Sequence, residues 1–148
     1  MGMDVCSESG IVFRATEILP KLFNKINKQQ LENVGKKILE TGLDQPKLKN
    51  GKDLVKWFVD NGQTEDNETI NSILEFCIGE LGLDLPLVEF RMWESSRMSG
   101  WQVPAGELCV VFNHHKIFET KLTPYGQKVA KQLGQKSLDL STWTWVSC

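Results

Sequence analysis

The chain has 148 residues, of which 41% are hydrophobic and 24% are charged, and its formal net charge is −2. This length suits one compact domain with a core, and the composition excludes a disordered or collagen-like chain. No apolar run is long enough to cross a bilayer, so we expect no membrane segment.

The N-terminal residues and the cysteines indicate the compartment. Residues 1–10, MGMDVCSESG, are polar and acidic, so we expect a flexible N-terminus without a secretory leader. The four cysteines show no CxxC spacing; they are Cys6, Cys77, Cys109 and Cys148. We therefore expect reduced thiols and a cytoplasmic protein.

Charge is unevenly distributed along the chain. Residues 11–58 carry ten Lys or Arg against five Asp or Glu. Residues 59–100 carry nine acidic residues against two arginines, and residues 101–148 carry five basic residues against three acidic ones. The first segment could therefore attract a polyanion, whereas the second would repel one.

The first part of the chain predicts two helices. Apolar residues recur at helical spacing over 18–26, where Pro20 is tolerated only in a first turn. A second helix is expected to begin at Asn27, which has capping-box spacing to Gln30, and to end at Gly42. Its predicted inward positions are Leu31, Val34, Ile38 and Leu39.

Two more helices are predicted after a lysine-containing loop at 43–51. The third is expected over about 52–61 and ends at Gly62; its inward residues are Leu54, Trp57 and Phe58. The fourth, over 67–82, has the clearest apolar stripe. The stripe consists of Ile70, Ile73, Leu74, Cys77, Ile78 and Leu81.

After residue 82 the hydrophobic period changes from 3.6 to 2, which predicts strands. Residues 85–93 and 116–122 alternate between apolar and polar residues, as half-buried strands do. Residues 106–112, GELCVVF, are apolar on both faces and predict a central strand. We expect the strand at 116–122 to supply one neighbour of this central strand.

The end of the chain predicts one more helix and one more strand. Thr123 and Pro124 are typical of a helix start, and Gly134 is typical of its end. The tail at 141–148, STWTWVSC, has high β propensity, and we expect it to dock on the chain's own sheet as the other neighbour of the central strand. The predicted fold class is α+β, in a single domain over 1–148. It has a helical N-terminal half, followed by a three- to four-stranded, mostly antiparallel sheet plus one helix.

The order strand, turn, strand and LTxxG helix over 108–134 resembles the wing and following helix of winged-helix domains. The matching residues are Leu122, Thr123, Gly126, Val129 and Leu133. Residues 50–62, NGKDLVKWFVDNG, resemble the second-helix region of DEP domains, which are winged helices that bind proteins or membranes. The resemblance covers about a third of the chain and implies a winged-helix-like fold, with the helix at 67–82 in the recognition position.

Nucleic-acid binding by that helix is disfavoured by its charge. It carries Glu68, Glu75 and Glu80 and no Lys or Arg, whereas DNA binding depends on basic residues that displace counterions from phosphates. The alternative surface is the basic N-terminal half. Its candidate phosphate contacts are Lys36, Lys37, Lys47, Lys49, Lys52 and Lys56. We favour the simpler interpretation that these lysines keep a helical surface solvated.

The sequence offers little evidence for a catalytic site or a metal site. His114 and His115 lie near Cys109, but no second pair completes a four-ligand site. Glu119 and Lys121 resemble the ExK pattern of many nucleases, yet the metal-binding Asp that this chemistry needs is missing from the neighbouring strand. The sequence contains no GxxxxGK, GxGxxG, GxSxG or HExxH motif. We therefore expect a protein without catalytic activity, metal or cofactor.

Five tryptophans are many for a chain of this length. Trp57 is assigned to the helical core, whereas the others gather in the predicted sheet region. They either fill the core or line a pocket or interface, where tryptophan is enriched. The candidate binding residues are Trp93, Trp101, Trp143, Trp145, Arg91 and Arg97.

Three functions follow as hypotheses. The first is non-catalytic recognition of a protein partner through the tryptophan-rich sheet surface or the acidic helix. The second is a nucleic-acid-binding, winged-helix-like regulator that uses the basic N-terminal half. The third is a small-ligand-binding domain with a tryptophan-lined pocket. A homodimer is compatible with each of them.

Overall fold

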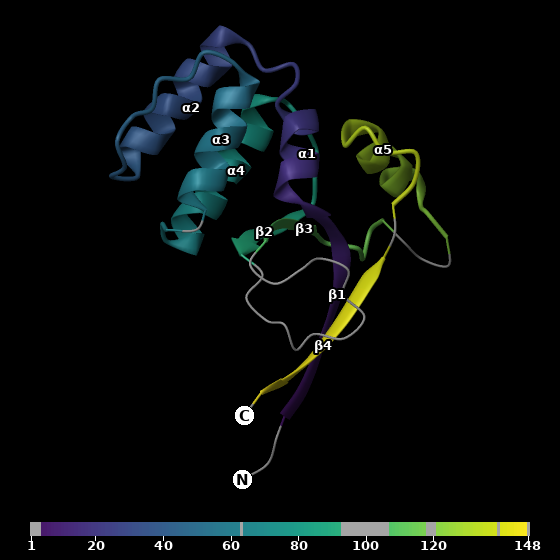
Figure 1. The fold of residues 1–148 in the computed structure, drawn as a ribbon. Helices are drawn as coiled ribbons and strands as arrows, with labels where there is room; N and C mark the ends of the chain where they lie inside the picture. The colour runs from purple at the N-terminus through teal and green to yellow at the C-terminus, as the bar shows by residue number, and fades with distance from the viewer. Residues whose placement is uncertain (1–3, 63, 93–106, 118–120, 139, 148) are drawn as a thin grey trace.

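The structure is a computed structural model that describes residues 4–62, 64–92, 107–117, 121–138 and 140–147; for 4–9, 88, 91, 92 and 141–147 it describes the backbone. The elements in chain order are β1 (Asp4–Arg14), α1 (Ala15–Leu22), α2 (Lys28–Glu40), α3 (Gly51–Asn61), α4 (Asn67–Glu80), β2 (Leu87–Met92), β3 (Leu108–Phe112), α5 (Pro124–Gln132) and β4 (Ser141–Ser147). Helices α2, α3 and α4 lie on one side of α1, and α5 lies on its other side (Figure 1). The fold is α+β, as predicted.

The sheet has the order β2-β3-β1-β4, and each neighbouring pair is antiparallel. All five residues of β3 are buried, which confirms the prediction of a central strand. Its neighbours, however, are β1 and β2. Within the stretch 116–122, residues 116 and 117 belong to a turn that begins at 115, and Leu122 forms a single bridge. Residues 118–120 lie outside the described residues. With both edges of β3 occupied, this stretch has no edge of β3 to pair with.

Strand β1 corrects the expectation of a flexible N-terminus over 1–10. Residues 4–10 pair with 141–147, and residues 11–14 pair with β3. The tail therefore docks on the chain's own sheet, as predicted, but its partner is β1. The residues DVCSESG lack a hydrophobic alternation, so the local pattern does not indicate that the two ends of the chain pair with each other.

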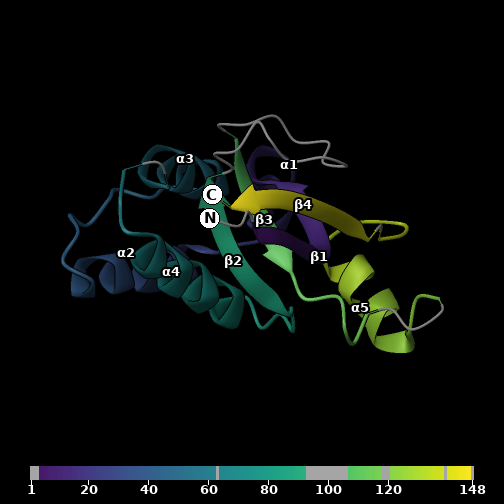
Figure 2. The same ribbon diagram turned by 90° about the horizontal axis from the view of Figure 1, so that it is seen from below.

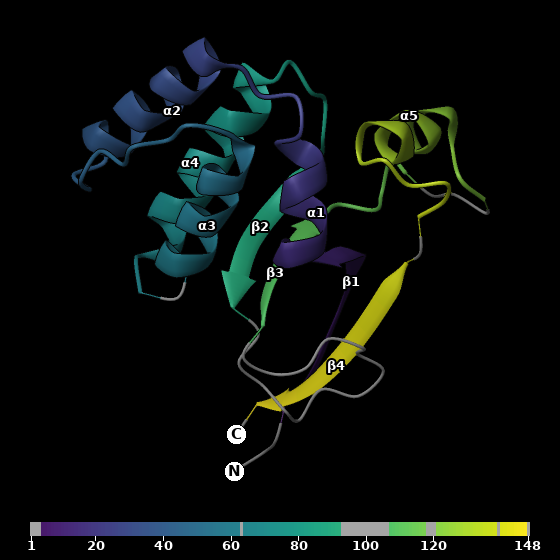
Figure 3. The same cartoon turned by 45° about the horizontal axis from the view of Figure 1, so that its top comes forward.

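The paired ends of the chain form a two-stranded ribbon, defined here as residues 4–10 and 141–147. It continues the sheet beyond β3 and extends away from the helices, with both termini at its far end (Figures 1 and 3). Among the described strands, residues 4–10 pair only with β4 and β4 pairs only with β1. Both outer edges of the ribbon are therefore open in the described part of the chain.

Helix α1 follows β1 directly, and this placement corrects the predicted position of Pro20. Because the helix begins at Ala15, Pro20 lies inside it and not in the first turn. A proline there cannot donate to the carbonyl of Thr16 and crowds it. The helix ends at Leu22, two residues after the proline.

The capping box of α2 is present as predicted. Asn27 Oδ1 accepts from the Gln30 amide at 2.8 Å, and Gln30 Oε1 accepts from the Asn27 amide at 2.9 Å. Gln30 Nε2 also donates to the Glu80 carbonyl at 3.0 Å, and Asn33 Nδ2 donates to Glu80 Oε1 at 2.6 Å. The start of α2 is thus fixed to the end of α4. The predicted inward position Leu39 is wrong, because this side chain is 53% exposed.

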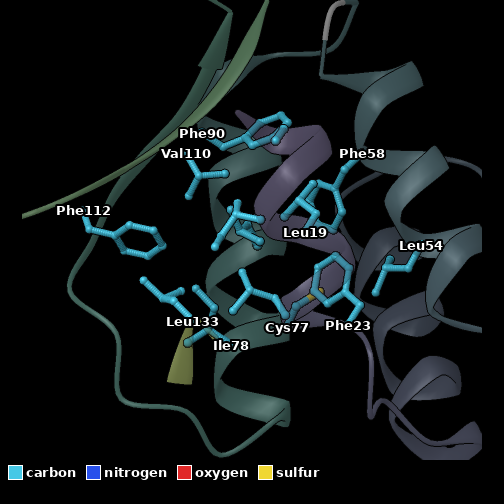
Figure 4. Packing of buried hydrophobic residues seen from close by; sticks show 14 of the residues in the cluster. Leu19, Phe23, Leu54, Phe58, Cys77, Ile78, Phe90, Val110, Phe112 and Leu133 are labelled. Atoms are coloured by element: carbon cyan, nitrogen blue, oxygen red, sulfur yellow. The ribbon is translucent and has the colours of Figure 1, made fainter. Parts of the chain in front are cut away.

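The core lies between helices α1, α3 and α4 and strands β2 and β3 (Figure 4). Phe23 of α1's C-terminal end stacks on Phe58 of α3 at 5.7 Å between ring centroids, and Phe58 meets Phe90 of β2 edge-on at 5.8 Å. Half-buried Trp57 contacts Phe58 at 5.1 Å and packs against the core, as predicted. Aromatic contacts thus connect the helical layer to the sheet.

Helix α5 begins and ends as predicted. The Thr123 hydroxyl accepts from the Gly126 amide at 3.0 Å, Pro124 is the first helical residue, and Gly134 has a φ of 66°. The Gln132 side chain holds α5 against the connection between α4 and β2. Its Oε1 accepts from the Asp84 amide at 2.7 Å, and its Nε2 donates to the Asp84 carbonyl at 3.0 Å.

The outer edge of β2 is met by a side chain of α4. Asn71 Nδ2 donates to the Phe90 carbonyl at 3.0 Å, and Asn71 Oδ1 accepts from the Phe90 amide. Both backbone groups of Phe90 are therefore satisfied without a neighbouring strand. The amide of Asn71 replaces a strand at this residue, which protects an otherwise open edge.

We expect Asn71→Ala to lower the free energy of unfolding by about 2–3 kcal/mol, because it leaves a buried amide and a buried carbonyl without partners. Urea denaturation followed by tryptophan fluorescence measures the change. Asn67→Ala is the matched control, since Asn67 is exposed on the same helix, and its effect should stay within about 0.5 kcal/mol. Equal effects of the two substitutions would contradict a role for Asn71 in covering the edge.

Candidate functional site

The candidate aromatic and arginine residues are only partly within the described chain. Trp93, Arg97 and Trp101 lie outside the described residues. Trp143 and Trp145 lie in β4, and Arg91 lies in β2, where the structure describes the backbone. Their strands are the two ends of the sheet order.

The strand register shows how far apart these positions are. Arg91 pairs with Cys109, which pairs with Arg14, whereas Trp143 pairs with Glu8. Three strand spacings separate β2 from β4, roughly 14 Å, and the six residues from Glu8 to Arg14 add roughly 20 Å along β1. The backbone therefore does not bring Arg91 to the tail tryptophans, and these residues do not form one compact site.

The six candidate phosphate-binding lysines come from α2, α3 and the loop between them. Lys36, Lys47, Lys49, Lys52 and Lys56 are exposed. Lys37 is half-buried, with its Nζ 5.9 Å from the centroid of the Phe76 ring, so this lysine contacts α4. Five of the six candidates thus present their charge to solvent.

Only two of the three acidic residues predicted to form the surface of α4 are exposed. Glu68 and Glu75 are exposed. Glu80 is half-buried and accepts a hydrogen bond from Asn33, which belongs to α2. It therefore serves the packing of α2 on α4, and the free acidic surface of α4 is limited to the other two residues.

The candidate metal and nuclease residues are not assembled. His114 and His115 follow β3, with ring centroids 4.3 Å apart. Glu107, the carboxylate at the edge of the same strand, forms an ion pair with Arg14 Nε at 2.9 Å, while Glu119 lies outside the described residues. The described residues contain no group of three His, Cys, Asp or Glu side chains that could hold a metal ion.

A groove of about 590 Å³ lies where the C-terminal ends of α1, α4 and α5 meet, and we call it the α1–α5 groove. Its lining combines apolar leucine side chains, which we call the floor, with lysine side chains. Leu22 is buried, and Leu81 and Leu83 are half-buried. Exposed Lys21 and Lys25 line the groove from the α1 side, and exposed Lys131 lines it from α5. No carboxylate is among its described lining residues.

A second cavity, also of about 590 Å³, lies beside the N-terminal end of α5. Asp84, His115, Lys116 and Tyr125 contribute titratable groups to its lining. Asp84 Oδ1 accepts from the Tyr125 hydroxyl at 3.4 Å, and Asp84 Oδ2 lies 3.9 Å from Lys128 Nζ. Burial and the negative charge of Asp84 raise the pKa of Tyr125, so the phenol stays protonated at neutral pH. These contacts fix α5 and leave no activated nucleophile.

A third cavity, of about 410 Å³, lies between α1 and α3. Phe23, Gly51 and Val55 contribute to its lining, and Lys52 is the candidate phosphate contact found there. None of the three cavities described here has tryptophan in its lining. The hypothesis of a tryptophan-lined pocket therefore gains no support from them.

Cys77 is fully buried in the apolar stripe of α4, as predicted. Burial raises the pKa of its thiol, and the charge of Glu80 raises it further. Because the thiolate is the nucleophilic form, a buried thiol with a raised pKa is a poor nucleophile at neutral pH. Cys109 is a second buried cysteine, and Cys6 and Cys148 lie where the structure describes no side chains.

We expect Cys77 to resist thiol reagents in the native state and to react once the chain is unfolded. Above the ordinary thiol pKa of 9.0, the unfolded chain releases the Cys77 proton while the folded chain keeps it. The free energy of unfolding should therefore fall as the pH rises, by about 1.4 kcal/mol more at pH 10 than in Cys77→Ala. Peptide mapping after labelling, and unfolding curves at several pH values, test both expectations. Rapid native labelling of Cys77 would show that the stripe is exposed.

Comparison of the chain with family models, with curated proteins and with solved structures finds no match. Within the described residues, no helix combines the length and the apolarity that crossing a bilayer requires. Function must therefore be inferred from the charges and side chains that the described surfaces present.

The α1–α5 groove is the feature that the sequence did not reveal. Lys21 and Lys131 each stand in the last turn of a helix, which is a common position for a lysine because it offsets the helix dipole. Only the packing of α5 beside α1 places them across one groove. Because the helix dipole explains each lysine separately, the sequence does not indicate that the two line the same groove.

Proposed function

We propose that this chain is a non-catalytic recognition protein that binds another protein. The observation that carries the proposal is the two-stranded ribbon of residues 4–10 and 141–147. Two strands alone are marginally stable in water, and open strand edges readily pair with an added strand. A partner that covers the ribbon would stabilise its two strands and would pair with the hydrogen-bonding groups of its open edges.

The composition of β4 supports a protein as the ligand. Trp143 and Trp145 are two residues apart, and alternation along a strand puts them on one face. Tryptophan is enriched in the residues that dominate binding energy at protein interfaces. The exposed Glu68 and Glu75 of α4 offer a second, polar surface on the same molecule.

The experiment is a quantitative affinity capture from the native host with three immobilised proteins. These are the intact chain, the variant Trp143→Ser/Trp145→Ser, and the control Thr142→Ser/Thr144→Ser, which changes the alternate positions of the same strand. We expect the intact chain and the control to retain the same protein, and the tryptophan variant to lose most of it. Circular dichroism establishes that each variant is folded.

Two outcomes would contradict the proposal at different levels. If the intact chain retains no protein above the level of an empty matrix, protein recognition is wrong. If the tryptophan variant retains the partner as well as the intact chain does, the function stands and the ribbon is not its surface. Sedimentation of the intact chain alone shows whether the partner is a second copy.

The second candidate function is nucleic-acid binding, and it is favoured by the lysines of α2, α3 and their connecting loop. Five of the six candidates are exposed, and none of them forms an ion pair within the described part of the chain. Unpaired surface lysines can bind phosphates without reading a sequence. They also serve simply to solvate a helical surface.

We expect no tight binding of duplex DNA at physiological salt, because the exposed carboxylates of Glu68 and Glu75 on α4 would repel a duplex from the helix in the recognition position. A gel shift at submicromolar protein over a range of salt concentrations tests this expectation. A salt-dependent shift would contradict it. In that case Lys47→Glu or Lys49→Glu should weaken binding equally for all sequences and lower the salt slope by about one.

A further inference from the structure

We propose that the α1–α5 groove binds an acidic, leucine-containing segment of a partner protein. This inference rests on the proposed function, because it names a site and a partner chemistry for protein recognition. It is independent of the ribbon. The groove lies at the opposite end of the helices from the ribbon's free end, beside α5 (Figures 1 and 3).

The first argument is charge complementarity. Lys21, Lys25 and Lys131 present three positive charges around one groove, and within the described residues none of them forms an ion pair. The nearby carboxylates are already engaged, since Asp84 contacts Tyr125 and Lys128, and Glu80 accepts from Asn33. The positive charge of the groove therefore has no counterpart inside the described chain, and an anionic ligand supplies one.

The second argument is the apolar floor. Leu81 and Leu83 remain half-exposed between the lysines, and Leu22 lies buried beneath them. A purely ionic ligand, such as a phosphate, would leave these leucines in water. A segment in which apolar side chains alternate with carboxylates would bury the leucines and reach the lysines together.

The groove fits a protein segment better than the other anionic ligands. A single-stranded nucleic acid binds through bases stacked on aromatic side chains, and none of the described lining residues is aromatic. A second copy of this chain could offer the acidic surface of α4, which carries Glu68 and Glu75. That pairing would join two different surfaces, so it would produce an open chain of copies unless a twofold or ring arrangement closed it.

Helix dipoles account for only part of the arrangement. Lys21 and Lys131 offset the dipoles of α1 and α5, a role that would make them contributors to stability. Lys25 lies beyond the end of α1 and has no such role, and a dipole effect requires no leucine floor. The two roles also differ in their readout, because a dipole effect changes the melting temperature and does not affect peptide affinity.

The test uses a fluorescein-labelled peptide in which leucines alternate with glutamates, and it measures fluorescence anisotropy against protein concentration. We expect Lys21→Glu/Lys131→Glu to weaken binding by about tenfold, since it replaces two attractive charges by two repulsive ones. The matched control is Lys36→Glu/Lys56→Glu, which makes the same change in net charge on α2 and α3. Both helices lie on the other side of α1 from α5 (Figure 2), and we expect less than about a twofold effect there.

Two further probes test the chemistry of the occupant. A peptide with serine in place of every leucine should bind markedly less tightly, because it leaves the floor exposed. A single-stranded oligonucleotide and vesicles of anionic lipid should bind less tightly than the leucine–glutamate peptide. The inference is overturned if the control variant weakens binding as much as the groove variant does, if the serine peptide binds equally well, or if either of the other probes binds more tightly in the groove.

The failure of this inference can be told apart from the failure of the proposed function. The groove variant is added to the affinity capture from the native host, beside the tryptophan variant. If it retains the partner as fully as the intact chain does, the groove is not the site, while protein recognition stands. If the intact chain retains no protein at all, the proposed function itself is wrong.

Discussion

Deletion of residues 141–148 is expected to lower the melting temperature by about 10 °C and to expose surface that binds an apolar dye. Seven residues of β4 pair with β1, and the deletion leaves residues 4–10 without a strand partner. Loss of this ladder should cost about 3 kcal/mol, because each cross-strand pair contributes roughly 0.2–1 kcal/mol. For a chain of this length, that loss corresponds to the stated shift.

Calorimetry of the intact and truncated chains, with dye binding at room temperature, measures this effect. The control is Thr142→Ser/Thr144→Ser, which keeps the strand and its length and should melt within about 2 °C of the intact chain. A different outcome would be equally informative. If the truncated chain melts unchanged but loses self-association, β4 is an interface and its tryptophans do not belong to the fold of one copy.

Gly51→Ala is expected to destabilise the chain by about 3 kcal/mol, at the upper end of the usual range for overpacking. Gly51 is the first residue of α3, where a Cβ atom would lie 2.3 Å from the Phe23 carbonyl oxygen. A backbone oxygen cannot rotate away as a side chain can. Helix α3 would therefore have to move from α1, which would separate the stacked rings of Phe23 and Phe58.

Gly79→Ala supplies the matched control within another helix. Gly79 is exposed in α4, and a Cβ atom there would have no neighbour within 4 Å. We expect this substitution to stabilise the chain by about 0.5–1 kcal/mol, because alanine favours a helix over glycine. Urea denaturation of both variants gives the comparison. A neutral Gly51→Ala would contradict the close approach of α3 to the end of α1.

The helices could be predicted from the sequence because their signals are local. The box of Asn27 and Gln30 lies within one turn of chain, as does the cap formed by Thr123 over Gly126. The apolar stripe of α4 has the period of the helix it forms, and it predicted correctly that Cys77 is buried. Each of these features depends on residues a few positions apart.

The pairing of the strands depended on the tertiary structure. The sequence predicted that β3 is central, but it favoured the stretch 116–122 as a neighbour where the structure has β1 and β2. Strand β1 was missed because its first seven residues are held by hydrogen bonding to the distant β4, which no local pattern encodes. A strand's partner is a property of the whole sheet, not of the segment.

The candidate binding residues were likewise predictable in part from the sequence, and the rest depended on the tertiary structure. From the sequence alone, the tryptophans, lysines and acidic residues could be named as residue types suited to binding, and the α+β class could be predicted. The packing of the chain decided which of them share a surface. It placed Arg91 and Trp143 at opposite ends of the sheet, engaged Glu80 with α2, and brought Lys21 and Lys131 to one groove. The physical reason is that periodicity and capping act over a few residues, whereas a shared surface requires residues distant in the chain to be packed together.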